Sequence, residues 1–486
     1  MSNVLFRILK ETHKFTSTAN VFTKATTARN NLYSRVSPLG DPRISVIPVL
    51  DKWVEEGRKV KAHDLQRLVK SLRSGRRYKQ ALEVSEWMSN KELGKFSLAD
   101  RAIQLDLIGR VRGLEFAENY IENMDDEEKI DKIYGALLNC YVREGLVDKA
   151  LSIMQKIKEL GFAGTTLNYN DLMCLYTRTG QFEKVPDILS EMKENNVTPD
   201  NFSYRICMNA YATTNDLDNV EIILKEMESQ PSISMDWLTY ATVAHIYIKV
   251  GEKQKAIGYL KKCEEIVGKD VLGYNHLISL YASLGDKDEM MRLWGLQKAK
   301  CKKQVNRDYI TMLGCLVKLG EFEESEKLLE QWESSSRFYD FRVPNVLLIG
   351  YCKEGLIEKA EGMFQNWVQK QKRPIPNSWS ILAAAYANKQ NMEKAFECMK
   401  EALAVQEENV WWRPKAELIS NILSWLGDNG DIEEVEAFVS SLESKFPKNR
   451  EMYHTMVKAY DRVGKEVNVL AADKEADGDE EAKMKL

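Results

Sequence analysis

The sequence predicts an all-α protein, a solenoid of about eleven helix–turn–helix repeats of about 35 residues each. Two observations predict this fold class. Apolar residues recur with the period of an α-helix, and glycines recur with a period near 35 residues. Because a hairpin of two short helices has no closed core of its own, the repeats must bury their apolar faces against one another.

The most regular repeat spans residues 166–200. An apolar stripe at i, i+3, i+4 and i+7 predicts its first helix: Tyr169, Leu172, Met173 and Tyr176. Gly180 follows, where the end of a helix favours a left-handed glycine cap. A second apolar stripe over residues 182–192 predicts the second helix. Because Pro186 lies inside that stripe and has no N–H to donate, we expect a kink or a late helix start there.

The turn glycine recurs along the chain, and we call its place in each repeat the turn position. Neighbouring turn glycines are 34 or 35 residues apart, except across two gaps of 71 and 75 residues. Asn215 and Gln390 stand at the vacant turn positions, and Asn tolerates left-handed backbone better than most residues. Less regular repeats centred on Gly75 and Gly113 precede a series whose turn glycines are Gly145, Gly180, Gly251, Gly285, Gly320, Gly355, Gly430 and Gly464.

Two further positions repeat in step with the turn position. Five residues after it, most repeats have a small or β-branched residue, which lets the second helix pack closely on the first. Eleven residues before it, most repeats have an aromatic residue. The small positions are Ala150, Val185, Val220, Ala256, Ala360, Ala395 and Val435; the aromatic positions are Tyr134, Tyr169, Tyr204, Tyr240, Tyr274, Tyr309, Trp379 and Tyr453.

The motifs of catalysis and cofactor binding are missing from the sequence. The histidines form no HExxH or HxE pair, and there is no GxSxG, no phosphate-cradling GxxxxGK(S/T) and no strand-linked GxGxxG. The cysteines form no CxxC pair and lie in helical stripes, which favours reduced, packed thiols over metal or redox use. No stretch is long and apolar enough to predict a membrane span. We therefore expect no enzyme, no metal site and no cofactor.

The two ends of the chain differ in charge from its middle. Residues 1–37 hold six Lys or Arg and one acid, and Leu5, Ile8, Leu9 and Phe15 can share one face of a short basic helix. This pattern is typical of an organellar transit peptide, with the mitochondrion favoured over the plastid, and a plain disordered tail is the alternative. Residues 465–486 hold four Lys and seven acids, which predicts an acidic disordered tail. The repeats therefore fill residues 38–464, and any nucleic-acid surface must be a local stripe, because the net charge of the whole chain is −4.

The unit NYNDLMCLYTRTGQFEKVPDILSEMKENNVTPD, residues 168–200, resembles the pentatricopeptide repeat, whose pattern is TYN-x-LI…K-x-G…A…M…G-x-x-PD. Residues 134–161, 201–211, 271–286 and 345–364 resemble it too. Tetratricopeptide repeats are the nearest competitor, but their W-x₂-L-G-x₂-Y opening is absent. The layout looks like a plant organellar protein of the pure-repeat class, without the deaminase-like extension of RNA-editing members. The resemblance implies a right-handed superhelix that binds RNA and performs no base chemistry.

In the family that this chain resembles, each repeat is taken to hold one RNA base. The residue after the aromatic position and the last residue of the repeat read that base, and we call these the base-reading positions. Asn170 with Asp200 resembles a uridine-preferring pair, and Ser420 with Asn449 an adenine-preferring one. Asn275 and Asn345 stand at the same position beside less suitable partners. The alternative is that all of these are ordinary polar surface residues.

A cation stands two residues before the turn position in six repeats, and we call this set the basic rail. Stacked repeats would align these cations, so they could follow the phosphates of single-stranded RNA. The alternative is that each cation merely stabilises the C-terminal end of its own helix through the helix dipole. The basic rail comprises Arg143, Arg178, Lys249, Lys318, Lys353 and Arg462.

The sequence therefore predicts a non-catalytic organellar protein that holds single-stranded RNA along the inner wall of a solenoid and so supports transcript stability, processing or translation. A protein-interaction scaffold is the second hypothesis, for instance a component associated with the organellar ribosome. The degenerate base-reading positions and the acidic net charge favour the scaffold. The basic rail and the Asn170/Asp200 pair favour RNA.

Overall fold

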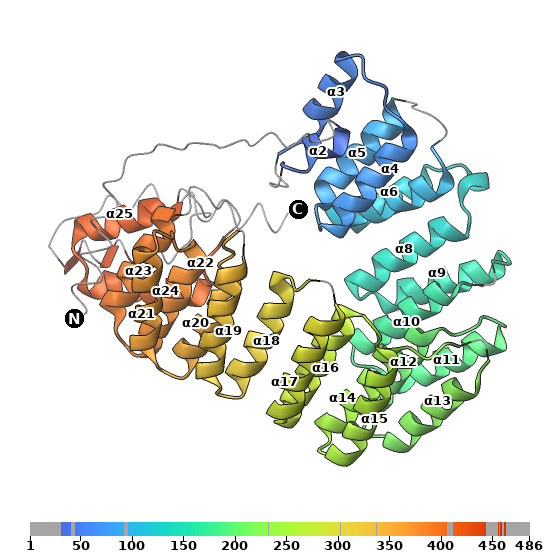
Figure 1. Cartoon of the computed structure of the whole chain (residues 1–486). Coiled ribbons are helices and arrows are strands. Elements are labelled where there is room, and N and C mark those ends of the chain that lie inside the picture. The colour runs from blue at the N-terminus through green and yellow to red at the C-terminus, as the bar shows by residue number, and fades with distance from the viewer. Residues whose placement is uncertain are drawn as a thin grey trace. The chain divides into compact units, whose positions relative to one another are not determined.

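The protein is described by a computed structural model, in which every regular element is a helix (Figure 1). The structure describes residues 31–39, 44–91, 96–162, 164–231, 233–301, 303–336, 338–405, 412–443, 455, 457–458 and 461–462. Across these residues no β-strand occurs, and no helix is long and apolar enough to cross a membrane. The predicted all-α repeat architecture is confirmed.

The described helices belong to two compact units that divide between Leu284 and Gly285. The first unit contains α2 (Leu32–Val36), α3 (Ile47–Glu55), α4 (Ala62–Ser74), α5 (Tyr78–Asn90), α6 (Leu98–Val111), α7 (Leu114–Glu122), η1 (Asp126–Glu128), α8 (Asp131–Glu144), α9 (Val147–Glu159), α10 (Thr166–Arg178), η2 (Phe182–Lys184), α11 (Val185–Glu194), α12 (Asn201–Thr213), α13 (Leu217–Ser229), α14 (Trp237–Lys249), α15 (Lys253–Ile266) and α16 (Val271–Leu284).

The second unit begins at Gly285 and continues the pattern of helical hairpins. It contains α17 (Lys287–Lys300), α18 (Asn306–Lys318), α19 (Phe322–Ser335), α20 (Pro344–Lys353), α21 (Ile357–Gln369), α22 (Pro376–Asn388), α23 (Met392–Val405), α24 (Ala416–Asn429) and α25 (Ile432–Glu443).

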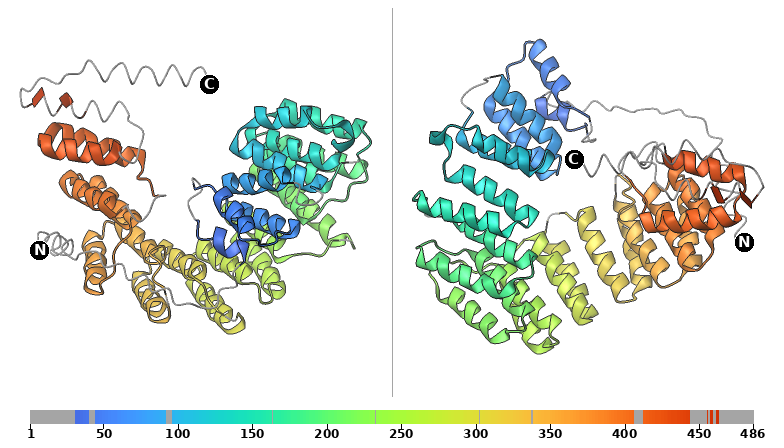
Figure 2. Two further views of the ribbon diagram at one scale, coloured as in Figure 1. Left: turned by 90° about the horizontal axis from the view of Figure 1, so that it is seen from above. Right: turned by 180° about the vertical axis from the view of Figure 1, so that it is seen from behind.

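Within each unit the first helices of successive hairpins pack side by side (Figure 2). The order of contact is α6, α8, α10, α12, α14 and α16 in the first unit, and α18, α20, α22 and α24 in the second. We call each of these rows a first-helix layer. The second helices pack on the other side of their own first helices, for example α15 on α14 and α23 on α22. Equivalent residues of consecutive repeats are thereby brought next to one another.

The short helix α2 (Leu32–Val36) is part of the folded protein. Leu32 and Val36 are buried, and the Arg77 guanidinium donates hydrogen bonds to the carbonyl oxygens of Val36 and Ser37. This helix lies inside residues 1–37, the range assigned above to a transit peptide, so that boundary stays a prediction. The tail at residues 465–486 lies outside the described residues.

Most turn positions have the left-handed backbone that the glycine pattern predicts. The φ angle lies between +71° and +84° at the six turn glycines from Gly145 to Gly355, and Asn215 and Gln390 have φ of +60° and +58°. Gly430 is an exception, because its φ of −75° and ψ of 155° are extended. There the chain passes from α24 directly to the N-terminal cap of α25, where the Asp431 carboxylate accepts a hydrogen bond from the Glu434 N–H. Gly464 lies outside the described residues.

The first two repeats depart from the pattern in different ways. At Gly75 the left-handed residue is the next one, Arg76, with φ of +58°, because Gly75 still closes the last turn of α4. Gly113 has φ of +102° and stands directly before α7. The late helix start expected at Pro186 is confirmed. A 3₁₀ turn precedes α11, and Pro186 lies in the first turn of α11.

The small positions form the tightest contact within each hairpin. Ala150, Val185, Val220, Ala256, Ala360, Ala395 and Val435 all have an exposed fraction of 0%. The described aromatic positions are buried as well, except the half-buried Tyr240. Burial of side chains from both helices in every hairpin creates one continuous apolar seam within each unit.

In several repeats a tyrosine four residues before the turn position joins the hairpin to the preceding one. In the repeat of α8 the Tyr141 hydroxyl lies 2.8 Å from a carboxylate oxygen of Glu118 on α7, and the Lys149 ammonium also lies 2.8 Å from that oxygen. Lys149 lies over the Tyr141 ring as well. We call this arrangement the tyrosine latch. It recurs as Tyr351, Glu326 and Lys359 and as Tyr386, Glu361 and Lys394.

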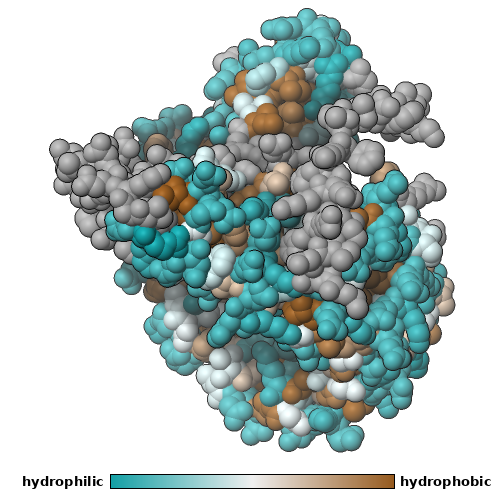
Figure 3. All heavy atoms as spheres, turned by 90° about the vertical axis from the view of Figure 1, so that its left-hand side faces the viewer, coloured by the Kyte–Doolittle hydropathy of each residue, from teal (hydrophilic) through white to brown (hydrophobic). Residues whose placement is uncertain are grey.

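The described surface on the face drawn in Figure 3 is largely hydrophilic, with apolar side chains in small separate patches. Long charged side chains cover the apolar seam at many places, as Lys149 covers Tyr141.

Ala360→Leu should lower the free energy of unfolding by roughly 1–3 kcal/mol, because the added carbons would have to enter a fully packed contact between α21 and α20. Urea denaturation followed by circular dichroism measures the change. Glu358→Leu, an exposed site on the same helix, should change the value by less than about 0.5 kcal/mol. Equal effects of the two substitutions would show that the small position is not the tight contact proposed here.

Candidate nucleic-acid interface

The two base-reading positions of the most regular repeat lie in direct contact. The Asn170 side-chain amide on α10 donates to the Asp200 carboxylate at 3.2 Å, and its oxygen accepts a hydrogen bond from the Ser203 hydroxyl at 2.6 Å. Asp200 is the N-cap of α12 and accepts the Ser203 N–H at 2.8 Å. The capping box of one repeat therefore fixes the base-reading amide of the repeat before it.

Asp200 remains an ionised acceptor in this arrangement. Partial burial alone would raise the pKa of Asp200, but the hydrogen bonds from Ser203 and Asn170 outweigh it, and the pKa lies below its ordinary value. The Asp200 residue is exposed, whereas Asn170 is only 3% exposed. A ligand at this pair would meet the carboxylate first and the amide behind it.

The same positions of the next repeat form an ion pair. A guanidinium nitrogen of Arg205 on α12 lies 2.9 Å from the carboxylate of Asp236, the N-cap of α14, and 3.3 Å from the Thr239 hydroxyl. The two base-reading positions of this repeat are therefore paired with each other within the protein.

The other predicted base-reading residues lie in varied surroundings. Asn345 is 3% exposed and accepts a hydrogen bond from the Ser378 hydroxyl at 2.8 Å, while its buried amide nitrogen has no partner among the described residues. Asn275 is 7% exposed. Ser420 is half-buried on α24, and Asn449 lies outside the described residues. No finding tests these assignments, which remain proposals.

The basic rail contains two kinds of residue. Arg143 and Arg178 are engaged within the first unit: Arg143 contacts Asp106 at 3.1 Å, and Arg178 donates to the carbonyl oxygens of Val142 and Arg143 at 2.8 and 2.9 Å. Arg178 therefore caps the C-terminal end of α8, a helix of the preceding repeat, in addition to lying in the last turn of its own helix. The exposed members are Lys249, Lys318, Lys353 and Arg462.

Sequence reasoning missed a third position on the first helices. Leu167, Phe202 and Leu272 stand three residues before a base-reading position and are 64%, 46% and 48% exposed. Large apolar side chains exposed at one repeated position offer flat faces on which bases can stack. The available signal was an apolar residue outside the buried stripe, at one fixed distance before the turn position.

A buried carboxyl group lies beside these positions on α10. Burial raises the pKa of Asp171 to about 6, and Asn139 on α8 contacts this carboxyl group with an amide nitrogen at 3.4 Å. Asp171 is therefore mostly ionised at pH 7, although burial makes its charged form unfavourable.

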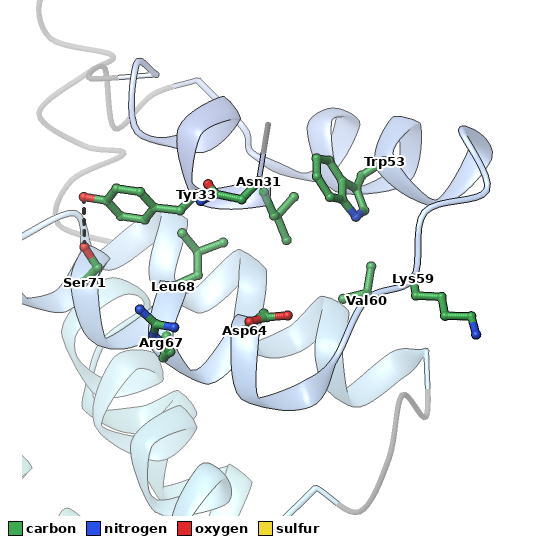
Figure 4. A pocket seen from close by; sticks show the side chains of 10 residues that line it. Asn31, Tyr33, Trp53, Lys59, Val60, Asp64, Arg67, Leu68 and Ser71 are labelled. Carbon is green, nitrogen blue, oxygen red and sulfur yellow. Dashed lines mark hydrogen bonds between the residues drawn. The ribbon is translucent and has the colours of Figure 1, made fainter. Parts of the chain in front are cut away.

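A cavity of about 390 Å³ lies between α2, α3 and α4. In Figure 4, Tyr33 and Trp53 lie on one side of this cavity. Residues of α4 line the other side: Asp64, Arg67, Leu68 and Ser71. The Ser71 and Tyr33 hydroxyls are 3.5 Å apart. The lining mixes aromatic and polar groups without forming a row that repeats along the first-helix layer.

Family models match most of the helical hairpins described above. A model of the PPR repeat matches residues 132–162, 202–230, 273–296, 308–336 and 343–371, and a model of the PPR repeat family matches residues 164–213. A tetratricopeptide repeat model matches residues 239–266 and 376–409. A mitochondrial pentatricopeptide repeat-containing protein of Arabidopsis thaliana is 47% identical over 437 residues, which cover 90% of this chain and 89% of that protein. The chain belongs to the pentatricopeptide repeat family.

Other relatives include a mitochondrial repeat protein and a ribosomal protein. A second mitochondrial pentatricopeptide repeat-containing protein of Arabidopsis thaliana is 37% identical over 86% of this chain and 85% of its own length. The large ribosomal subunit protein mL101 of the same plant is 38% identical over 89% of each chain. Among solved structures, the pentatricopeptide repeat protein PPR10 from maize is similar, with 16% identity, a TM-score of 0.46, and coverage of 85% of this chain and 62% of that one.

Asp171→Asn should stabilise the protein by roughly 1–2 kcal/mol at pH 7. The folded pKa of Asp171 lies near 6, above the value of about 3.9 in an unfolded chain, so deprotonation costs stability as the pH rises between these values. The advantage of the variant should therefore disappear below about pH 4. Urea denaturation at pH 4, 5.5 and 7 measures it, and a difference that does not depend on pH would contradict the assignment.

Proposed function

We propose that this pentatricopeptide repeat protein is a non-catalytic mitochondrial RNA-binding protein that holds single-stranded RNA along its first-helix layers. The observation that carries the proposal is the contact between Asn170 and Asp200. It joins the two base-reading positions across neighbouring hairpins, with the exposed Leu167 and Phe202 beside them in sequence. Stacking on the apolar side chains and hydrogen bonds to the base edge would together bind an unpaired nucleotide.

The pair retains capacity to bind a base. An amide has two N–H donors and an oxygen with two lone pairs, of which Asn170 uses one donor on Asp200 and one lone pair on Ser203. The remaining donor and acceptor match the carbonyl and N–H groups on the pairing edge of uracil. Because the capping box holds the amide in place, little side-chain entropy is lost on binding.

The mitochondrial assignment rests on the relatives and on the chain itself. Two Arabidopsis relatives that match most of this chain are named mitochondrial. The basic, acid-poor composition of residues 1–37 fits the same destination, with the plastid as the alternative.

A second candidate is a role in the mitochondrial ribosome. A relative that is 38% identical over 89% of this chain is a protein of the large ribosomal subunit. The Arg205–Asp236 ion pair favours this candidate too, because it engages two base-reading positions in a contact within the protein.

Crosslinking in mitochondria distinguishes the two candidates. The first predicts that RNA recovered with the protein consists of one or a few short transcript segments. Ribosomal RNA together with ribosomal proteins as the main recovered material would favour the second. A different mitochondrial repeat protein, crosslinked and purified in parallel, serves as the control for abundant RNA that is recovered nonspecifically.

Asn170→Ala should reduce the preference for uridine at one position of the bound RNA, since it removes the amide that faces the base. Binding of short RNAs with each base at that position, measured by fluorescence anisotropy, tests this. Asn195→Ala removes an exposed amide at the end of α11 in the same hairpin and should leave the preference unchanged.

Lys318→Ala combined with Lys353→Ala should instead lower affinity for all sequences and flatten its dependence on salt, because both cations are exposed at the ends of first helices. The same anisotropy titrations at several salt concentrations measure this. A base-specific loss in this double variant would contradict its assignment to the phosphate backbone.

A further inference from the structure

Four consecutive hairpins of the first unit have an arginine in the last turn of the first helix. These residues are Arg73 on α4, Arg110 on α6, Arg143 on α8 and Arg178 on α10. Three of them converge on the Asp106 carboxylate, with nitrogen–oxygen distances of 3.0 Å from Arg73, 2.9 Å from Arg110 and 3.1 Å from Arg143. We call Asp106 and these three arginines the Asp106 cluster.

The Asp106 cluster combines a buried centre with accessible edges. The Asp106 side chain is 9% exposed, whereas those of Arg73, Arg110 and Arg143 are 35%, 27% and 22% exposed. Burial would raise the pKa of Asp106, but the guanidinium groups of Arg110 and Arg73 outweigh it, and the pKa lies below its ordinary value. One ionised carboxylate therefore holds three guanidinium groups whose outer N–H donors remain close to solvent.

Neighbouring residues shape this arrangement. A Cβ atom at Gly109 would lie 3.0 Å from Nη2 of Arg143 and 2.6 Å from the Cys140 sulfur, so the glycine makes room for Arg143 between α6 and α8. Nη2 of Arg143 is itself buried and has no hydrogen-bond partner among the described residues. Arg178 fixes the backbone below through the carbonyl oxygen of Arg143. The guanidinium donors that a ligand can reach therefore lie mainly on the more exposed Arg73 and Arg110.

Positive charge exceeds negative charge at this place. Besides Asp106, the carboxylate near the three arginines is that of Glu144, 3.6 Å from Nε of Arg143. Burial raises the pKa of Asp171 on α10 to about 6, so this carboxyl group is mostly ionised at pH 7, and burial also raises the pKa of the Cys140 thiol, which stays protonated. Arg110 also lies over the Tyr78 ring, at 5.0 Å. With Arg178 included, the last turns of these first helices therefore hold four arginines against the carboxylates of Asp106, Glu144 and Asp171.

We propose that the Asp106 cluster is a phosphate-binding site that anchors the RNA backbone on the first unit. The inference rests on the proposed function and adds Arg73 and Arg110 to the residues that would contact RNA. Guanidinium groups bind phosphate oxygens through paired N–H donors. Arg110 and Arg143 lie on the first-helix layer, Arg73 lies on the first helix before it, and an RNA strand bound along this layer would contact them. Asp106 is a positioning residue, which keeps the three groups together against their mutual repulsion.

Arg73→Gln combined with Arg110→Gln tests the site by anisotropy titration of a labelled single-stranded RNA over a range of salt concentrations. The slope of log affinity against log salt should become shallower by about 1.4, since about two phosphate contacts are lost at about 0.7 each. Arg112→Gln with Lys149→Gln is the matched control. It removes the same charge from side chains that are 45% and 52% exposed and are paired with Glu86 and Glu118, and its slope should stay at the wild-type value.

A second measurement uses the unaltered protein and so does not depend on the folding of a variant. Phenylglyoxal modifies accessible arginines, and bound RNA should reduce modification of Arg73 and Arg110 at least several-fold, as read by mass spectrometry, while Arg112 reacts as before. RNA binding with an unchanged slope in the double variant and no protection would overturn the Asp106 cluster alone. Failure of the wild-type protein to bind any single-stranded RNA would overturn the proposed function as well.

Discussion

The contact between neighbouring first helices is the constraint on which this protein depends. A single hairpin exposes the apolar faces of both helices, and only the next hairpin covers them. Ala150, Val185 and Val220 have an exposed fraction of 0%, so the stack covers these small positions completely. In several repeats the tyrosine latch then ties the hairpin to its predecessor by a hydroxyl, a carboxylate and an ammonium group, as in Tyr141, Glu118 and Lys149. The apolar seam supplies the driving force, and the latch favours one spacing, because displacement would leave partly buried polar groups without partners.

The same contact creates the candidate interface. The N-terminal cap of one first helix lies against the base-reading residue of the previous repeat, so a structural capping box and a recognition pair share atoms at Asn170, Asp200 and Ser203. Sharing has two consequences: recognition groups are held in place before a ligand arrives, and a substitution there affects stability as well as selectivity. At Arg205 and Asp236 the two base-reading residues form an ion pair with each other, and Asp236 also caps α14.

Charge on the first-helix layer follows the same logic. Helix C-terminal ends favour cations, so an arginine in the last turn is stabilised by its own helix before it contacts anything else. Stacking then brings such ends together, and Asp106 and the carbonyl oxygens of Val142 and Arg143 offset the repulsion that would result. Helix stabilisation and a phosphate-binding surface, which are alternatives for an isolated helix, are therefore compatible in a stacked repeat.

The sequence by itself determined the helices, their turn positions and the residues of the seam, because these depend on local periodicity and on the backbone freedom of residues such as Gly180 and Asn215. It also placed Asn170 and Asp200 in one pair. Only the tertiary structure decided what depends on two hairpins at once: the contacts of Arg73 and Arg143 with Asp106, and the role of Arg178 as a cap for the first helix of the preceding repeat. The partners in these contacts are mostly more than thirty residues apart. No local pattern encodes which polar atoms meet across a stack, since this is set by the distance and rotation between neighbouring hairpins.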